Sequence, residues 1–409
     1  MNTQAPLAGL RIIESSILGP AAITTALVDL GAEVIKVESP SGDYIREMTW
    51  PIIEGVSLMH YHLNRGKKSI TLDLKREEAR EIYRDLVRDA DVVIEASKPG
   101  TLDKYGLGFD DLKKVNPKIV FCTVSGYGMT GPYRDMPSHG IAYDTWAGVV
   151  SPAYDDEGFC YIPEHVSIGI NAAPLFGGLG VLAGVIRARA TGEGCFMDLA
   201  QSDAAAAFDW YRSESYLAYA RPAAIVTGNK ADGYERRPVA TAGMREGVRY
   251  QLYESQDGHV LFMASEQSLW RNFCEGVGRM DLFEKWPGSK FADHARGNRE
   301  LQTVLRDIFK TKRSREWLDF SIRVNTPIAP VNTPKNIVDD PQFQSRFEIW
   351  PHERHGADML GFPVRFVGEP TLEPARAPTV GEHGDEVLRD VLGYDAAKIA
   401  AIKASKLLG

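Results

Sequence analysis

The stretch "LRIIESSILGPAAITTALVDLGAEVIKVE", residues 10–38, sets out a strand, a helix and a second strand. Residues 10–16 form a short apolar run, and residues 19–32 carry apolar side chains at helical spacing that end beside a glycine. Residues 33–38 form a second apolar run. Elements of this length in this order predict two parallel strands joined by a crossover helix.

The same alternation continues downstream of this unit. Further strands are predicted at "SITLDLK", "DVVIEA" and "KIVFCTVSGY", with a charged amphipathic helix, "REEAREIYRDLVRDA", after the first of them. Repeated units of this kind predict an α/β fold, a Rossmann-like parallel sheet with helices on both faces. The glycine fingerprint G-x-G-x-x-G is missing after the first strand, so dinucleotide binding is not indicated. Residues 185–220 are predicted to be a long helical stretch.

A second unit is indicated further along the chain. Residues 222–248 are rich in glycine, proline and charge, and a hairpin is predicted to turn at Gln256–Gly258. Helices follow to about residue 325, and the proline-punctuated residues 325–343 are expected to lead back to the first domain. The last residues predict two helical segments joined by a turn.

Composition narrows the class of protein. The net charge of −8 disfavours nucleic acid as a partner. The four cysteines lack C-x-x-C spacing, which predicts reduced thiols, no disulfides and no zinc or other metal site. The N-terminal residues lack the pattern of a secretory leader, and we find no run of eighteen apolar residues that would span a membrane. We therefore expect a soluble cytoplasmic protein.

Several blocks match one protein family in order and spacing. They include "GPAAITTALVDLGAEVIKVESPSGD", "LNRGKKSITLDLK", "GVLAGVIRARATGEGCFMDLAQSDA", "TPIAPVNTPKNIVDDPQF" and "VGEHGDEVL". Through these blocks, nearly the whole chain closely resembles the family III CoA-transferases and the related α-methylacyl-CoA racemases. The resemblance implies a large Rossmann-like CoA-binding domain, residues 1–220 and 330–409, whose sheet is built from both termini. It also implies a smaller α/β domain, residues 221–329, and two subunits interlocked like linked rings.

The resemblance further implies a site for coenzyme A, which the family binds as a substrate. The matching positions put Ile17 and Leu72 near the pantetheine and adenine, and Lys75, Lys98 and Lys104 near the phosphates. Alternatively, these lysines are ordinary solvated surface charges.

The family's reaction needs an aspartate that attacks the thioester and is acylated, within a pattern close to "VSIGD". This chain reads "VSIGI", so Ile170 occupies the position of the nucleophile and cannot be acylated. Asp144 and Glu164 are candidate replacements, or else ordinary surface or capping carboxylates. His139 matches a racemase base, although a histidine that lines the pocket is the simpler interpretation.

Three hypotheses follow. In the first, this chain is the non-catalytic subunit of a heteromeric CoA-transferase, and a paralogous subunit supplies the aspartate. The chain is then similar to one subunit of the family's two-subunit enzymes that move CoA from succinyl-CoA to benzylsuccinate, an aryl-succinate of anaerobic degradation. In the second, it is a self-sufficient homodimeric transferase with a displaced carboxylate. In the third, it binds or senses CoA esters without catalysis.

Overall fold

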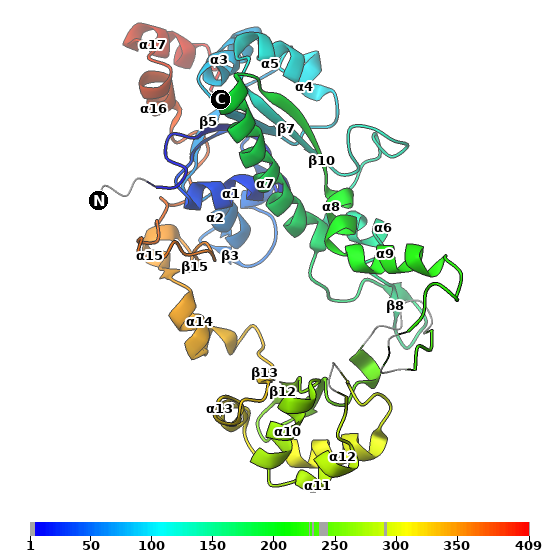
Figure 1. Ribbon diagram of the computed structural model, residues 1–409. Helices are drawn as coiled ribbons and strands as arrows, with labels where there is room; N and C mark the ends of the chain where they lie inside the picture. Colours follow the sequence, from blue (N-terminus) through cyan, green and yellow to red (C-terminus); the bar gives the residue numbers. More distant parts are fainter. Residues whose placement is uncertain (1–4, 229, 231–232, 237–243, 290–292, 409) are drawn as a thin grey trace. The chain divides into compact units, whose positions relative to one another are not determined.

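The computed structural model describes residues 5–228, 230, 233–236, 244–289 and 293–408 (Figure 1). The chain divides into two compact units. Unit 1 is Met1–Trp210 with Ser345–Gly409, and unit 2 is Tyr211–Gln344. The sequence analysis placed the boundaries near residues 220 and 330, so the structure assigns more of the chain to unit 2.

Unit 1 is built on a six-stranded sheet in which every strand pair is parallel. The strand order is β10-β7-β6-β1-β2-β5. β1 lies in the middle, with Ile12 opposite Val34 on one side and Val92 on the other. The strands are β1 (Arg11–Ser15), β2 (Glu33–Glu38), β5 (Lys68–Thr71), β6 (Val92–Glu95), β7 (Val120–Ser125) and β10 (Cys195–Ala200). A parallel α/β sheet is confirmed.

Alternate side chains of these strands enter two hydrophobic cores, one on each face of the sheet. One core joins Ile12, Val34 and Val92 to the helices α1 (Ala22–Asp29) and α7 (Ile168–Thr191). The other joins Ile13, Ile35 and Val93 to α3 (Glu77–Arg88) and α5 (Phe109–Val115). Because both faces are covered by helices (Figure 1), strands β1, β2, β6 and β7 are buried along most of their length, as expected for a parallel sheet.

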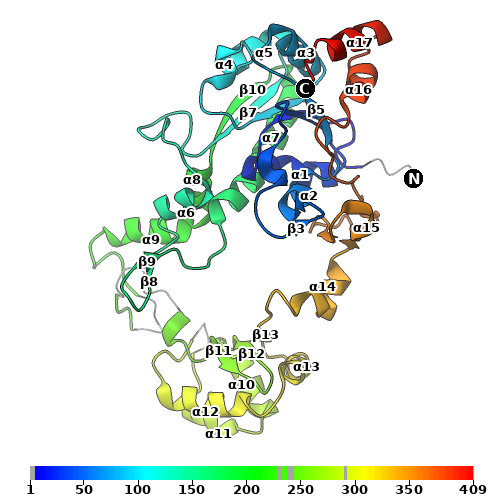
Figure 2. The ribbon, with the colours of Figure 1, turned by 180° about the vertical axis from the view of Figure 1, so that it is seen from behind.

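The C-terminal residues contribute to unit 1 through helices. All six strands of the sheet fall between residues 11 and 200, so the prediction of a sheet built from both termini is wrong for the strands. Instead, Val387, Leu388, Ile402 and Leu407 complete the core on the α3 face. Val387 and Leu388 lie in the π-helical turn Val387–Val391, which follows α16 (Gly384–Glu386) directly, while Ile402 lies in α17 (Ala396–Ala404) and Leu407 just after it (Figure 2).

The predicted helix over residues 185–220 is wrong in its middle. Gly192 ends α7 in a left-handed conformation, with φ of 79°. The chain then forms β10, which pairs with β7 from Cys195 to Ala200. Helices resume only at α8 (Gln201–Phe208) and α9 (Trp210–Tyr219). A glycine at this place is a common helix stop, and it separates the two elements.

The helix α7 is long and apolar enough to cross a membrane by length and composition alone, which differs from the sequence expectation. The structure gives it another role, since Val181, Val185 and Ala188 pack into the core against the sheet. A buried core helix meets the same criteria of length and composition.

The remaining elements of unit 1 lie in its loops and edges. They are α2 (Leu58–Asn64), α4 (Thr101–Lys104), α6 (Gly140–Trp146), α15 (His352–His355), and the two-residue strands β3 (Ile52–Ile53), β4 (Val56–Ser57), β8 (Ala153–Tyr154), β9 (Cys160–Tyr161), β14 (Ile349–Trp350) and β15 (Met359–Leu360). The two boundaries between the units fall within α9 and α14 (Pro341–Arg346).

Unit 2 has its own three-stranded antiparallel sheet, in the order β11-β12-β13. The predicted hairpin is confirmed, because β11 and β12 flank residues 255–258. Aromatic side chains such as Trp270, Phe273 and Phe309 form its core. Its elements are β11 (Gln251–Glu254), β12 (His259–Phe262), β13 (Ile328–Pro330), α10 (Gln267–Gly276), α11 (Met280–Lys285), α12 (Arg299–Phe309) and α13 (Ser314–Val324).

Candidate functional site

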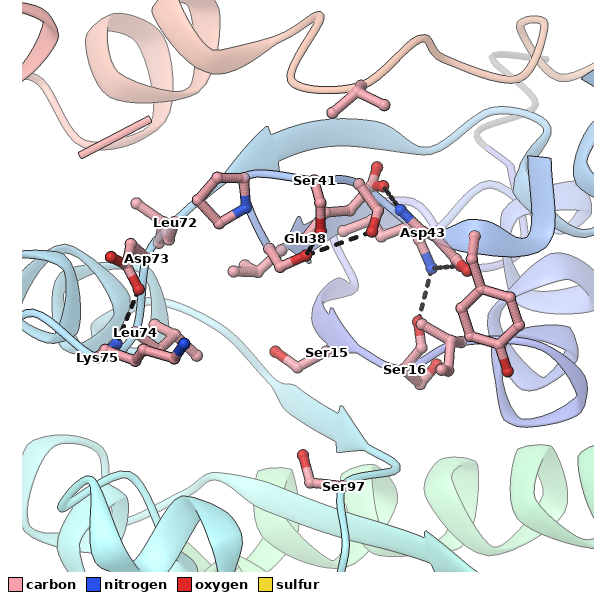
Figure 3. Close-up of a pocket in the computed structure, with 18 of the residues that line it drawn as sticks. Ser15, Ser16, Glu38, Ser41, Asp43, Leu72, Asp73, Leu74, Lys75 and Ser97 are labelled. Carbon is pink, nitrogen blue, oxygen red and sulfur yellow. Dashed lines mark hydrogen bonds and ion pairs between the residues drawn. The ribbon is translucent and has the colours of Figure 1, made fainter. Parts of the chain in front are cut away.

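A cavity of about 630 Å³ opens at the carboxyl ends of the central strands of unit 1 (Figure 3). Its walls are the residues after β1, the end of β2 with its following loop, the residues after β5, and Ser97 after β6. The strand order changes direction between the neighbouring strands β1 and β6, because the chain adds β2 and β5 on one side of β1 and then returns to add β6 on the other. Open α/β sheets bind ligands at such a crossover, outside the carboxyl ends of the strands.

Three of the five predicted CoA-binding residues line this cavity, namely Ile17, Leu72 and Lys75. Ile17 is 39% exposed, while Leu72 is buried. Lys98 and Lys104 do not line it, but each is adjacent in sequence to a residue that does, Ser97 and Tyr105. All three lysines are exposed, and no ion pair joins them to a carboxylate of the described residues. Their ammonium groups therefore remain available to an anionic ligand.

Beneath the cavity lies a group of buried charges that the sequence analysis missed. Glu14 accepts from Lys36 Nζ at 3.1 Å and from Lys67 Nζ at 2.8 Å, and also from Thr24. All are almost fully enclosed. Burial disfavours the charged form of Glu14, but the two lysines outweigh it and lower the pKa of Glu14. For Lys67 burial dominates and lowers its pKa to about 8, against the attraction of Glu14.

A second buried pair closes the loop after β2. Arg46 binds Glu38 through both terminal nitrogens, at 2.6 and 3.0 Å, and Ser69 Oγ donates to the same carboxylate at 2.6 Å. The backbone N–H of Asp43 donates to Glu38 at 2.8 Å. Burial opposes ionisation, yet Arg46 and Ser69 lower the pKa of Glu38. Because both terminal nitrogens of Arg46 donate to Glu38, the Arg46 side chain is held in place in the cavity wall.

Two adjacent serines at the end of β1 differ in their partners. Ser15 Oγ lies 3.0 Å from the Tyr83 hydroxyl, which is buried. Lys36 Nζ donates to the carbonyl of Ser16 at 2.6 Å, but the Ser16 hydroxyl has no hydrogen-bond partner among the described residues. Ser16 is only 3% exposed and lines the cavity. An unpaired buried hydroxyl is uncommon and calls for an explanation.

Ile170 lies in the first turn of α7, where it is half-buried between two glycines. A Cβ atom at Gly19 would lie 3.3 Å from Ile170 Cβ, and one at Gly140 would lie 2.9 Å from Ile170 Cγ2. Gly19 follows the cavity residue Ile17 by two positions, so Ile170 is next to the turn that carries one cavity wall. The predicted nucleophile position therefore holds a hydrocarbon packed against backbone.

The structure separates the two candidate replacements, Asp144 and Glu164, and the racemase-like His139. Asp144 is fully buried and accepts the backbone N–H groups of Gly169 at 2.7 Å and Ile168 at 3.1 Å. It also lies 3.3 Å from Nε2 of His165. Its carboxylate therefore caps the start of α7. His139 precedes α6 and is exposed, and Glu164 is exposed as well.

No group of three or more His, Cys, Asp or Glu side chains that could hold a metal ion occurs among the described residues. The chemical resources of the site are therefore the cavity, the exposed lysines beside it and the neighbourhood of Ile170. This combination suits a ligand with an anionic end and a long polar arm.

Comparison with known proteins gives a consistent result. The profile of "CoA-transferase family III" matches residues 7–384. The chain is 30% identical over 409 aligned residues to the succinate–glutarate CoA-transferase of Agrobacterium fabrum. The alignment covers 95% of this chain and 96% of that protein. It is 26% identical to the succinyl-CoA–L-malate CoA-transferase beta subunit of Chloroflexus aurantiacus, across 100% of this chain and 99% of the relative. A crystal structure of a CAIB/BAIF family protein from Brucella suis superimposes with a TM-score of 0.76 at 28% identity, covering 95% of this chain and 100% of that one.

Proposed function

Because the chain belongs to CoA-transferase family III, whose substrates are CoA thioesters and carboxylic acids, we propose that it acts as the non-catalytic subunit of a heteromeric CoA-transferase. A paralogous subunit carries the nucleophilic aspartate. This chain supplies the scaffold and one half of the paired assembly in the cytoplasm.

The observation that carries this proposal is the surroundings of Ile170. An acyl group can be captured only by a side chain with a nucleophilic atom, and isoleucine has none. Asp144, the nearest buried carboxylate in the candidate set, is held by two backbone N–H groups of α7. Moving it toward a thioester would leave those N–H groups unpaired. The geometry therefore favours a silent subunit over a displaced carboxylate.

The cavity supports the coenzyme part of the proposal. Lys75 is an exposed cation in the cavity wall, and Lys98 and Lys104 are exposed cations next in sequence to the wall residues Ser97 and Tyr105, so all three suit the phosphates of CoA. Ile17 and Leu72 provide apolar wall for the rest of the coenzyme. A chain without a nucleophile would still use this site to hold the coenzyme.

Exposed apolar side chains support the paired assembly. On α7, Leu175 is 65% exposed and Leu179 is 69% exposed, and Trp210, Tyr216 and Leu217 of α9 are also exposed. Leu175 and Leu179 lie one turn apart on α7, and an exposed apolar pair on one helix face supports a protein interface there. We propose that the partner subunit covers it in the interlocked arrangement of the family. One relative is itself named as the beta subunit of an enzyme, which agrees with a two-subunit design.

The substrates we propose are succinyl-CoA as donor and an aryl-succinate such as benzylsuccinate as acceptor. Several relatives are named for succinate or succinyl-CoA. For the acceptor, the ring of Tyr127 lies about 6 Å from those of Tyr133, Tyr143 and Trp146. Tyr143 lies directly beside Gly169, since a Cβ atom there would be 2.9 Å from Tyr143 Cβ. An aromatic surface therefore adjoins the reaction position.

The test compares the chain alone with the chain co-expressed with a homologue that has aspartate at the position of Ile170. Transfer of CoA from succinyl-CoA to benzylsuccinate is followed by chromatography. We expect no turnover by the chain alone and turnover by the pair. Turnover by the chain alone would favour a displaced carboxylate instead, and CoA binding without turnover in either sample would favour a CoA-ester-binding protein.

A further inference from the structure

The hydroxyl group of Ser16 is an unused hydrogen-bond donor at the cavity. Its neighbour Ser15 has its hydroxyl paired with Tyr83, and the Ser16 carbonyl is paired with Lys36. The Ser16 hydroxyl has no hydrogen-bond partner in the described part of the chain, although the residue is only 3% exposed. Such a group carries a desolvation cost that an acceptor in the cavity would remove.

The position of Ser16 indicates which part of a bound CoA it would meet. On one side of the cavity lie the loops with Lys75 and Lys98, which suit the phosphates. On the other side the chain continues from Ser16 to Gly19, which contacts Ile170. Three residues span at most about 11 Å, so Ser16 lies close to the turn that contacts the reaction position.

We propose that Ser16 Oγ donates a hydrogen bond to an amide carbonyl of the pantetheine arm of CoA, and that it thereby sets the position of the thioester end. The arm connects the phosphates to the sulfur, and its strongest acceptors are its two amide carbonyls. Ser16 lines the cavity, and in this proposal its hydroxyl meets the carbonyl by rotating about the Cα–Cβ bond to another staggered position. This assignment rests on the proposed binding of CoA.

Lys36 holds the backbone at this point. Its Nζ donates to the Ser16 carbonyl at 2.6 Å and to Glu14 at 3.1 Å, and it lies 3.1 Å from Asp43 Oδ2. The backbone of Ser16 is therefore fixed from below by a buried ammonium group, and only the side chain is left to respond to a ligand. A backbone held in this way is pre-organised, which reduces the entropy lost on binding.

The experiment is calorimetric titration of the full chain with CoA and with adenosine 3′,5′-bisphosphate, which lacks the pantetheine arm. We expect Ser16→Ala to weaken CoA binding about two- to tenfold, the value of one hydrogen bond, and to leave bisphosphate binding unchanged. The melting temperature should not fall, because the substitution removes an unpaired buried hydroxyl.

Ser265→Ala is the matched control. Ser265 is buried in unit 2, and its hydroxyl is paired with His294 Nδ1 at 2.8 Å. We expect this variant to have a lower melting temperature and unchanged CoA affinity. Equal weakening of both ligands in Ser16→Ala, or no weakening at all, would overturn the assignment to pantetheine. A wild-type chain that binds neither ligand would overturn the proposed coenzyme site as well.

Discussion

At the scale of single residues, Ile170 occupies the predicted position of the nucleophile, and Asp144 caps the helix on which Ile170 lies. The resemblance identifies position 170 as the expected position of the nucleophile. The isoleucine side chain at this position cannot be acylated. The role of Asp144 could not be read from the sequence, because its partners Ile168 and Gly169 lie 24 and 25 positions away. Only the packing of α6 against α7 makes it a helix cap.

The first prediction concerns Ile170→Asp. The aspartate is smaller than isoleucine, so it fits between Gly19 and Gly140 without a clash. It can be acylated by a bound thioester and then attacked by CoA thiolate. After incubation with succinyl-CoA, we expect the intact mass of this variant to increase by a covalent adduct.

Ile170→Asn is the control for that experiment. Asparagine has nearly the same shape and polarity as aspartate but no nucleophilic carboxylate, so the mass of this variant should stay unchanged. An adduct on the wild-type chain in the absence of a partner would contradict the silent-subunit interpretation, whatever the variants do.

At the scale of elements, α7 illustrates what a sequence pattern reveals and what it hides. Its many small residues predict close packing, and the structure confirms it. A Cβ atom at Gly177 would lie 2.8 Å from Ile23 and Leu199, and one at Gly184 would lie 2.9 Å from Val120. The strand β10 was missed because apolar and polar residues do not alternate in "CFMDLA", which fits a helix as well as a strand.

The second prediction uses two adjacent glycines of α7. Gly178 has no atom within 4 Å of a Cβ placed on it, whereas Gly177 has two side chains in its way. Gly178→Ala should raise the free energy of unfolding by about 0.5–1 kcal/mol through helix propensity. Gly177→Ala should lower it by about 1–3 kcal/mol through overpacking. Urea unfolding of the two variants measures the difference, and equal effects would show that α7 does not pack as closely as described.

The third prediction concerns His60, which ties α2 to the C-terminal segment. Its Nε2 lies 3.1 Å from the Pro378 carbonyl, and its Nδ1 lies 3.1 Å from Asn64 Nδ2. Burial, with a smaller effect from Arg46, lowers the pKa of His60 from 6.5 to about 4. Between these values the unfolded chain binds a proton that the folded chain excludes. This group's contribution to stability is therefore complete above pH 6.5 and declines as the pH falls toward 4.

The measurement is the free energy of unfolding at several values between pH 5 and pH 6.5. Each unit of pH should cost at most about 1.4 kcal/mol through His60. His60→Gln should be less stable throughout, but its stability should depend less on pH in this window. A pH dependence equal to that of the wild type would show that His60 is not the group responsible.

At the scale of the whole molecule, the sequence predicted which segments form strands better than it predicted which segments meet. Strands β1, β2, β5, β6 and β7 follow from local apolar runs. The buried group of Glu14, Lys36 and Lys67 joins positions up to 53 residues apart, and no local pattern identifies it. A charged residue inside an apolar run, as in "RIIES" and "EVIKVE", was the only available signal. Such residues are buried only with a partner, and the partner lies on another strand.

The last prediction tests whether the outer face of α7 is an interface. Leu175 and Leu179 lie one turn apart and are both more than 60% exposed, while Gly177 and Gly184 face the core. Burying two leucines against a partner would contribute about 1.5–3 kcal/mol each. The double variant Leu175→Glu, Leu179→Glu should therefore weaken association with the partner, or with a second copy, at least tenfold.

Sedimentation velocity over a range of concentrations, with the chain alone and with its companion subunit, measures this effect. The mass derived from sedimentation of the wild type should be well above that of one chain, 45.2 kDa. The mass of the double variant should approach that of one chain. Ile322→Glu alters a side chain that is 75% exposed on α13 of unit 2, and it should leave the association unchanged. A wild-type chain that stays at the mass of one chain under every condition would mean that this apolar face has another purpose. The paired assembly, and with it the borrowed aspartate, would then lose its structural basis.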